Sequence, residues 1–409
     1  MSTLLFVTVL FLLVLTNVRE ARLERMGADA PRRSRSAERI STAFLTPKGR
    51  WVRRGGAVIL AACFLTAVVL LTGATNSHPV VNICSLGEYI DEELITQFEE
   101  ETGISVNYQT SESNEAMYST VKSGAGDYDV VVTSDYMISQ LIEEGMLSEL
   151  DYDAIPNFSL ISERFRNLPY DPENRYTVPY SWGTLGIIYN TTMVDGEITS
   201  WSSLYDDRYA GNVLLIDNSR DALGEALFYL GYSVNTTNEN EIREAYQLIA
   251  DANHRGVFQG RVSDQVFQKM EGGNAAIATY YAGDFISMLE NNPDLAFVIP
   301  EEGSNWFVDA MCILKDAPHY EEAMTWINFI ASTDANLANM DYIGYASPNQ
   351  EALERYPAYY EELYEEPLDP EIYKIMAAPQ EVLDNCEAYL VLPPQTRKLY
   401  NDLWTELGI

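Results

Sequence analysis

The chain has 409 residues, of which 47% are hydrophobic and 21% charged, a balance typical of a folded globular protein rather than a disordered one. Its charge is uneven: residues 1–80 carry eleven Lys/Arg against four Asp/Glu, whereas residues 81–409 carry 15 Lys/Arg against 57 Asp/Glu, a net charge of −42. A body this acidic repels phosphates and attracts cations, so we predict no nucleic-acid partner.

Two uncharged stretches, residues 2–18 and 55–74, approach the length that crosses a bilayer. The Arg-rich residues 19–54 between them should stay cytoplasmic by the positive-inside rule, which sends the acidic body to the outside. We therefore predict a hydrophobic segment over residues 1–18, a basic cytoplasmic linker over 19–54, and a body held at the outer face of the cell membrane.

Three interpretations of residues 55–74 stay open. The segment is read as a signal-anchor, as a cleavable signal peptide ending near Ala74, or as a lipoprotein signal in which Cys63 follows Leu-Ala-Ala. Only about six apolar residues precede Cys63, fewer than the roughly 7–15 of a usual signal peptide. This short run favours the signal-anchor.

The cysteines argue against a metal site. Cys63, Cys84, Cys312 and Cys386 form no Cys-x-x-Cys pair and no metal-ligand spacing with the three histidines. Cys84 and Cys312 each lie in an apolar, strand-like run, so we expect buried free thiols rather than a disulfide. No metal and no cofactor is predicted.

Strands and helices alternate after residue 79. The apolar run Val80–Cys84 predicts a strand, Asp91–Thr102 predicts a helix that stops at Gly103, and Ile104–Tyr108 predicts the next strand. This order is a β-α-β unit.

The same alternation recurs further along the chain, where Tyr128–Thr133 predicts a strand and Met137–Glu144 a helix. We therefore expect an α/β fold with a mostly parallel sheet that is covered on both faces. Ligands of such sheets bind beyond the carboxyl ends of the strands, where Ser134, Asp135 and Tyr136 lie.

Several ordered motifs carry a family resemblance that runs from residue 81 to residue 409. The motifs are Ser85–Tyr89 (SLGEY), Glu101–Ile104 (ETGI), Glu112–Tyr118 (ESNEAMY), Tyr128–Tyr136 (YDVVVTSDY), Pro179–Gly183 (PYSWG), Val213–Arg220 (VLLIDNSR), Leu230–Thr237 (LGYSVNTT) and Ile343–Asn349 (IGYASPN). Together they resemble the bacterial spermidine/putrescine-binding proteins of polyamine ABC transporters. In addition, residues 2–18 are similar to the last transmembrane helix of the partner permeases.

The resemblance implies a two-lobed periplasmic-binding-protein fold of type II, with a hinge between the lobes. The expected domains are residues 81–182 plus 307–347 for lobe one, and residues 183–306 plus 348–409 for lobe two and the C-terminal helices. The implied function is that of an extracytoplasmic, monomeric binding protein, not an enzyme. It would bind putrescine or spermidine in the cleft between the lobes and deliver it to the ABC permease subunits.

A polyamine needs carboxylates for its ammonium groups and apolar or aromatic walls for its methylene stem, and a cation over a ring face gains about 0.5–2 kcal/mol. The resemblance implies that ten residues of this chain occupy the binding positions of the family. The walls fall on Tyr89, Tyr136, Tyr281, Phe307 and Tyr345, the carboxylates on Asp309, Asp221 and Asp284, and the polar contacts on Ser134 and Glu88.

Two positions, one wall and one end contact, depart from the family's pattern. Leu86 stands where the family commonly has tryptophan, and Asn218, with Asp217 beside it, stands where the family has an acid. The stretch Tyr281–Asp284 resembles the putrescine-type pattern and favours a diamine over spermidine.

Three other functions compete with polyamine binding. A ferric-iron-type binding protein of the same fold would use Tyr280 and Tyr281 as phenolate ligands, although Glu88 and Tyr89 stand where that class usually has histidine. A hydrolase is disfavoured because no GxSxG, HExxH, P-loop or GxGxxG motif occurs. An adhesin is disfavoured because the repeated strands of a sandwich are missing from the pattern.

Overall fold

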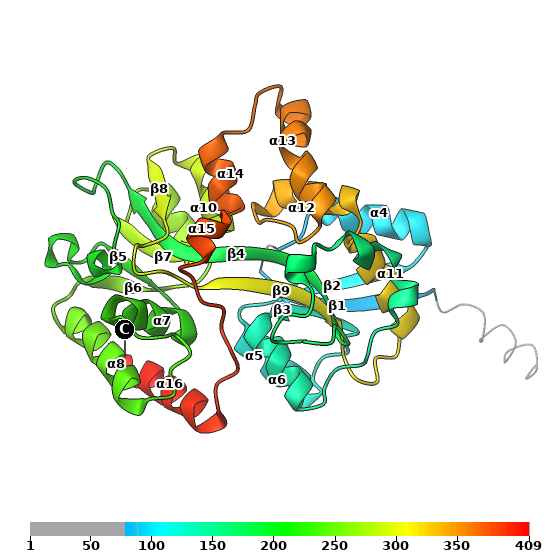
Figure 1. Cartoon of the computed structure of the whole chain (residues 1–409), viewed down its shortest axis with the longest axis horizontal. Coiled ribbons are helices and arrows are strands. Elements are labelled where there is room, and N and C mark those ends of the chain that lie inside the picture. The colour runs from blue at the N-terminus through cyan, green and yellow to red at the C-terminus, as the bar shows by residue number, and fades with distance from the viewer. Residues whose placement is uncertain (1–77, 88, 409) are drawn as a thin grey trace, which may run out of the picture. The chain divides into compact units, whose positions relative to one another are not determined.

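The computed structural model describes residues 78–87 and 89–408, which belong to one compact unit, His78–Ile409 (Figure 1). The predicted segments at 1–18, 19–54 and 55–74 and the predicted contact Glu88 lie outside the described residues. Within the described part, no helix has both the length and the apolar character that a bilayer crossing needs.

The strands form a mixed sheet. Their bounds are β1 (Val80–Leu86), β2 (Ser105–Ser111), β3 (Val130–Ser134), β4 (Thr177–Asn190), β5 (Val213–Ile216), β6 (Phe258–Val262), β7 (Ile277–Tyr281), β8 (Leu295–Val298) and β9 (Trp306–Ile313). The sheet order is β2-β1-β3-β9-β4-β7-β5-β6, and β8 pairs with β4.

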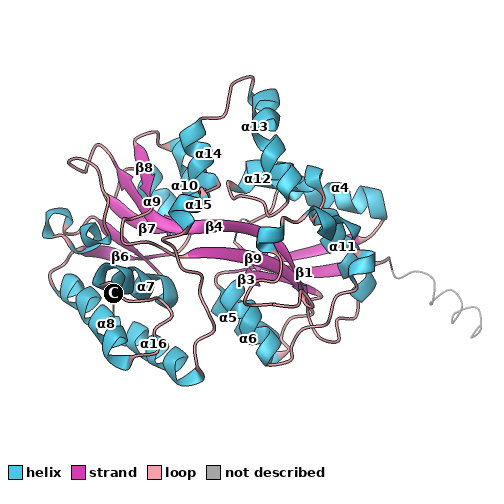
Figure 2. Cartoon of the chain, in the orientation of Figure 1, coloured by secondary structure: helices cyan, strands magenta, loops and turns pink. Residues whose placement is uncertain are grey.

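Helices cover both faces of this sheet (Figure 2). Their bounds are α4 (Glu92–Thr102), α5 (Asn114–Ser123), α6 (Asp135–Glu143), α7 (Ser219–Leu230), α8 (Glu239–His254), α9 (Gln265–Glu271), α10 (Ala282–Asn291), α11 (Tyr320–Ile330), α12 (Thr333–Ile343), α13 (Gln350–Tyr364), α14 (Pro370–Met376), α15 (Gln380–Leu383) and α16 (Pro394–Leu407).

Local sequence signals explain the first helix. The Asp91 carboxylate accepts a hydrogen bond from the Glu93 N–H, and Gly103 ends the helix with φ 70°, a conformation that glycine adopts without strain. Leu94 and Phe98 are buried on one face of α4, as the helical spacing predicts. The predicted β-α-β start is therefore confirmed, with β1 parallel to both β2 and β3.

The expectation of a mostly parallel sheet is wrong. β3 pairs antiparallel with β9, and β4 pairs antiparallel with β7, β8 and β9. The reason is that the chain crosses the middle of the molecule in extended form, through β4 and β9, rather than through a helical crossover of the kind that parallel pairing requires. Only the outer strands of each half keep the parallel β-α-β arrangement.

Two hydrophobic clusters define two lobes on this continuous sheet. Along β4 the first cluster ends at Trp182 and the second begins at Leu185, so the strand leaves one core and enters the other. We call the part of the chain that contributes to the first cluster lobe one, and the part that contributes to the second cluster lobe two.

The C-terminal part of the chain divides differently from the expected boundary at residue 347. Ala352 and Tyr356 of α13, Met376 of α14 and Leu383 of α15 are buried in the first cluster, whereas the second takes up the chain only from Tyr389. Residues 348–383 thus contribute mainly to the core of lobe one, although Ile372 and Ile375 of α14 pack against the second cluster.

This division adds a third connection between the lobes. Around Glu387 the chain runs beside the start of β9: the Glu387 N–H donates to the Ser304 carbonyl (2.9 Å), and the Trp306 N–H donates to the Glu387 carbonyl (3.2 Å). The Asn305 amide also donates to the Glu387 carbonyl (3.0 Å). No strand-like pattern in the sequence marks this crossing.

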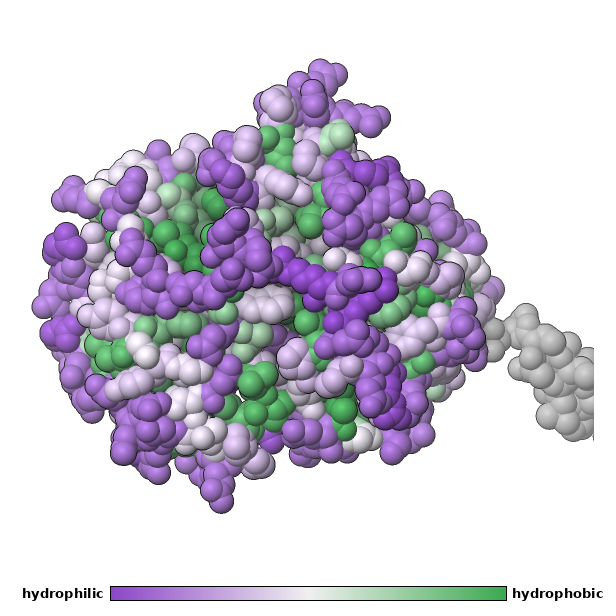
Figure 3. Space-filling view, in the orientation of Figure 1, coloured by the Kyte–Doolittle hydropathy of each residue, from purple (hydrophilic) through white to green (hydrophobic). Residues whose placement is uncertain are grey.

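The hydrophilic character of the surface agrees with the strongly acidic composition of residues 81–409. The face seen in Figure 3 is mainly hydrophilic, with apolar side chains only in small separate areas. Cys84 and Cys312 are buried free thiols, as expected.

Candidate functional site

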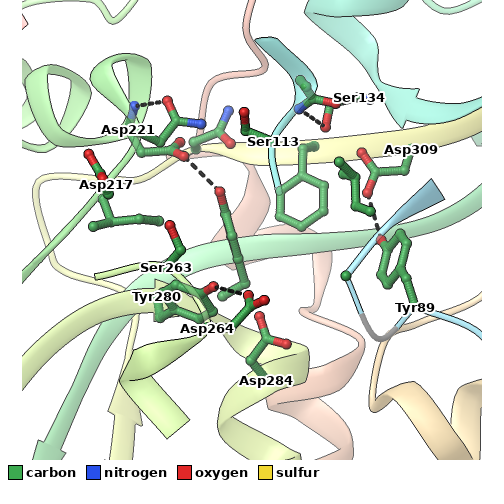
Figure 4. Close-up of a pocket in the computed structure, with 18 of the residues that line it drawn as sticks. Tyr89, Ser113, Ser134, Asp217, Asp221, Ser263, Asp264, Tyr280, Asp284 and Asp309 are labelled. Carbon is green, nitrogen blue, oxygen red and sulfur yellow. Dashed lines mark hydrogen bonds between the residues drawn. The ribbon is translucent and has the colours of Figure 1, made fainter. Parts of the chain in front are cut away.

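A cavity of about 420 Å³ lies between the lobes, within the range of small-ligand sites. Nine of the ten predicted contacts line it, and the tenth, Glu88, is not described. The nine are Tyr89, Ser134, Tyr136, Asp221, Tyr281, Asp284, Phe307, Asp309 and Tyr345. Figure 4 shows Tyr89 and Asp309 on one side of the cavity and Asp221, Asp264 and Asp284 on others. Most of these residues follow the carboxyl ends of strands, as expected for an α/β sheet.

Asp309 lies inside β9, between Ser134 of β3 and Ser181 of β4. The Tyr89 hydroxyl donates to its Oδ2 atom (2.6 Å) and also contacts the Ser181 hydroxyl. The Oδ1 atom is buried and accepts no hydrogen bond of normal geometry from the described residues. Burial raises the pKa of Asp309, and the neighbouring Tyr89 and Ser134 hydroxyls lower it.

Asn114, at the start of α5, orders the neighbouring polar wall. Its amide donates to the hydroxyls of Ser134 (3.0 Å) and Tyr136 (3.2 Å), and its carbonyl accepts from Thr133 (2.5 Å). The Tyr136 hydroxyl in turn donates to Glu115 (3.1 Å). These bonds fix Ser134 and Tyr136 at the end of β3.

Asp221 lies in the first turn of α7. It accepts hydrogen bonds from the hydroxyls of Tyr281 (2.7 Å) and Tyr389 (2.9 Å). Burial raises the pKa of Asp221 to about 6, and these two hydrogen bonds oppose that rise. Asn218, where the family has an acid, caps the same helix by accepting from the N–H groups of Arg220 (2.8 Å) and Asp221 (3.3 Å).

Asp284 lies in the first turn of α10, and it accepts a hydrogen bond from the Tyr345 hydroxyl (2.7 Å). Burial raises the pKa of Asp284 to about 7; the Tyr345 hydrogen bond lowers it and the nearby Asp264 charge raises it. The carboxyl therefore titrates close to neutral pH when the cavity is empty.

The aromatic wall is continuous. The Tyr281 and Phe307 ring centroids are 5.3 Å apart, those of Phe307 and Tyr345 are 6.2 Å apart, and those of Tyr345 and Tyr89 are 5.4 Å apart, all edge-to-face. Gly283 makes room for Tyr345, because a Cβ at that position would lie 2.3 Å from the tyrosine ring. Glycine is thus required in the Tyr281–Asp284 motif by packing.

The cavity lining also includes residues that were not among the predicted contacts, and the ones that bear on its chemistry are Asp135, Glu112, Asp217, Asp264 and Tyr389. Burial raises the pKa of Asp135 to about 8. Asp135 and Asp217 could have been predicted as cavity residues, because both lie at strand ends. Glu112 could also have been predicted, because it begins the family motif Glu112–Tyr118. Asp264 and Tyr389 could not, since each depends on a turn or a crossing that periodicity does not mark.

Six of the seven acids that line the cavity form two groups, and the seventh, Asp135, is buried and accepts a hydrogen bond from the Tyr136 N–H instead of a tyrosine hydroxyl. The floor acids are Asp221, Asp284 and Asp309, which are buried or half-buried and bonded to tyrosine. The rim acids are Glu112, Asp217 and Asp264, which are exposed.

This arrangement suits an organic cation that has an apolar stem. In the region that the structure describes, no three His, Cys, Asp or Glu side chains converge as a metal site would require. Carboxylates separated by aromatic rings can instead neutralise separate ammonium groups, while the rings contact the methylenes between them.

Comparison with known proteins gives a consistent result. Residues 93–363 match the family model described as bacterial extracellular solute-binding protein. A spermidine/putrescine-binding periplasmic protein of Escherichia coli (strain K12) is 35% identical over 292 residues, which cover 70% of this chain and 83% of that protein. A putrescine-binding periplasmic protein of Pseudomonas aeruginosa (strain UCBPP-PA14) is 27% identical over 375 residues, covering 87% of this chain and 99% of that protein.

A solved structure agrees with the sequence matches. The spermidine/putrescine ABC transporter substrate-binding protein of Streptococcus pneumoniae superposes with a TM-score of 0.68 at 35% identity. The match covers 80% of this chain and 98% of that one.

Proposed function

The chain belongs to the bacterial extracellular solute-binding proteins, and we propose that its solute is a polyamine, which it binds between its lobes and delivers to the permease of an ABC importer. Membership in this family makes the chain a binding protein and not an enzyme, with its binding body outside the cytoplasm. The identity of the solute is supported by relatives whose names include spermidine and putrescine.

One observation carries the proposal: the unpartnered Oδ1 atom of Asp309. Asp309 is only 3% exposed and lines the interlobe cavity, and its buried Oδ1 atom accepts no hydrogen bond of normal geometry from the described residues. A buried carboxylate oxygen without a donor costs free energy, which an ammonium group in the cavity would offset. We therefore place one ammonium group of the ligand at Asp309.

The second ammonium group would lie at Asp221 or Asp284 of lobe two. The rings of Tyr281, Phe307 and Tyr345 extend between Asp309 and these two acids, and they would contact the methylene stem. A ligand that reaches acids of both lobes binds the closed form better than the open form, so binding favours closure.

The ferric-iron alternative requires the phenol oxygens of Tyr280 and Tyr281 to converge on one ion. Instead, the Tyr281 hydroxyl donates to Asp221 (2.7 Å), and the Tyr280 hydroxyl is directed to Asp264 (3.4 Å). The two oxygens face different acids, so the geometry favours the organic cation.

The proposal also covers the N-terminal residues and the oligomeric state. We propose that residues 55–74 attach the protein to the membrane, that residues 2–18 are similar to a permease helix, and that the body is monomeric. The charge asymmetry around these apolar stretches supports the orientation, with the Arg-rich residues 19–54 in the cytoplasm.

Calorimetric titration tests the function. The protein is titrated with putrescine, cadaverine, spermidine and spermine, and with butylamine as a control that has a single ammonium group. We expect at least one polyamine to bind far more tightly than butylamine, because only a polyamine reaches acids in both lobes. Equal, weak binding of all five amines would refute the proposal, and a visible absorbance band on adding ferric ion would favour the iron alternative.

A further inference from the structure

We propose that the hydroxyl groups of the cavity tyrosines, and not only their rings, are positioning groups for polyamine binding, because their hydrogen bonds orient the floor acids and favour the charged form of each carboxyl group. This inference rests on the proposed polyamine function. It assigns to Tyr89, Tyr281, Tyr345 and Tyr389 a role that is separate from that of an aromatic wall.

The evidence is a pattern repeated at every floor acid. Tyr89 donates to Asp309 (2.6 Å) and Tyr345 donates to Asp284 (2.7 Å). Asp221 receives two such bonds, at 2.7 and 2.9 Å, the second from Tyr389 of the C-terminal crossing. The donors come from separate parts of the chain, so the pattern does not follow from one local motif.

The physical need for these hydroxyls comes from burial. A carboxyl group that is removed from water favours its neutral form, which attracts an ammonium group poorly. Hydrogen bonds donated to the carboxylate favour its charged form, and bonds between a neutral and a charged group are among the stronger ones. At Asp221, Asp284 and Asp309 the tyrosine hydroxyl lowers the pKa that burial raises.

Each tyrosine hydroxyl occupies one lone pair of its carboxylate, so acceptor sites remain for the ligand even at Asp221, which accepts from two hydroxyls. At Asp309 the Oδ2 atom accepts from Tyr89, while the buried Oδ1 atom accepts no hydrogen bond of normal geometry from the described residues. Tyrosine is well suited to this dual role, because its ring can contact methylenes while its hydroxyl holds the acid. Phenylalanine would keep the first contact and lose the second.

Asp284 gives the clearest test because it has a single tyrosine donor. The ionisable groups that face it are Tyr345 after α12, Tyr280 of β7 and Asp264 in the turn before α9. Only Tyr345 favours the ionised form, whereas the Asp264 charge opposes it. Removing the Tyr345 hydroxyl should therefore leave Asp284 neutral at pH 7.

The experiment measures the Kd of the tightest-binding polyamine between pH 6 and pH 8.5 for wild type and Tyr345→Phe. We expect the variant to bind roughly tenfold to a hundredfold more weakly at pH 7, the size of a lost hydrogen bond to a charged group. The difference should shrink at pH 8.5, where the acid ionises without help. Tyr281→Phe should shift the pH profile less, since Tyr389 still donates to Asp221.

Tyr364→Phe is a matched control, because it removes a tyrosine hydroxyl from Asp341 (2.9 Å) outside the cavity. It should leave polyamine binding unchanged at every pH. A Tyr345→Phe variant that equals wild type, or is weaker by the same factor at all pH values, would overturn the inference. If wild type binds no polyamine even at pH 8.5, the proposed function itself fails; thermal unfolding of each variant verifies that it is folded.

Discussion

The floor and the rim of the cavity use the same carboxyl group in opposite physical settings. The floor acids are withdrawn from water and held by tyrosine hydroxyls, and burial raises the pKa of each. The rim acids are exposed, and Asp217 lies 3.6 Å from the Arg261 guanidinium. A charge in water interacts weakly, whereas a desolvated charge interacts strongly with a partner of opposite sign. The floor should therefore determine affinity, and the rim should determine mainly how fast a cation arrives.

The largest effect is expected for Asp309→Asn. The variant removes the charge opposite an ammonium group and keeps the shape of the side chain. Breaking a buried charged pair costs about 3–5 kcal/mol, so putrescine should bind at least a hundredfold more weakly. Asp217→Asn at the rim is the control for loss of charge alone. Calorimetric binding of Asp309→Asn within about threefold of wild type would contradict the assignment.

The next effect concerns the wall above the floor acids. Phe307→Ala and Tyr281→Ala should each reduce the binding free energy by about 1–3 kcal/mol, since each removes buried apolar area and a ring face for a cation. Tyr280→Ala should cost less, because its hydroxyl faces Asp264 at the rim. If Tyr280→Ala proves the more damaging of the two tyrosine variants in titration, the wall has been assigned one residue out of register.

A smaller effect should appear as pH dependence of stability. The folded-state pKa values of Asp221 (about 6) and Asp284 (about 7) lie above the ordinary 3.8. Between pH 3.8 and about 7, the folded protein binds more protons than the unfolded chain does. The free energy of unfolding of the empty protein therefore falls as pH rises through this range. A cationic ligand favours the ionised acids, so it should raise Tm more at pH 8 than at pH 5.

Thermal unfolding with and without saturating putrescine measures this dependence. Asp284→Asn should flatten it, because the variant removes the group that titrates near pH 7. An equal rise in Tm at pH 5 and at pH 8 would show that the floor acids are already ionised in the empty cavity.

The smallest effect is expected at the rim. Neutralising Asp264 or Glu112 with the corresponding amide should change the Kd less than about threefold, because exposed charges are screened by salt. Stopped-flow kinetics should show slower association at low ionic strength, with dissociation almost unchanged. A clear increase in the dissociation rate would move Asp264 from the rim to the floor.

The sequence predicted the elements that depend on local patterns. Apolar periodicity placed β1 and α4, and strand-end reasoning placed Ser134 and Asp135 at the cavity. It could not predict that Asp309 would keep one oxygen unpartnered, since this depends on three neighbouring strands whose pairing is not local.

The tyrosine–carboxylate pairs escaped prediction for the same reason. Tyr345 and Asp284 are 61 residues apart, and Tyr389 and Asp221 are 168 apart. The family resemblance supplied most of these residues as walls and acids but not their pairing. Tyr389 was missed altogether, because the crossing that carries it has no regular periodicity.

Each of the two cores is built from segments that are far apart in the sequence, and this has a consequence for folding during synthesis. The first core needs residues up to Leu383, and the second needs α16, whose Tyr400, Leu403 and Leu407 are buried in it. Neither core can close while the ribosome still holds the C-terminal residues. Because a core that lacks a helix leaves apolar surface uncovered, the growing chain should remain incompletely folded until synthesis is almost finished. A protein that must leave the cytoplasm before folding would thereby keep its export-competent state longer than one whose first lobe was contiguous in sequence.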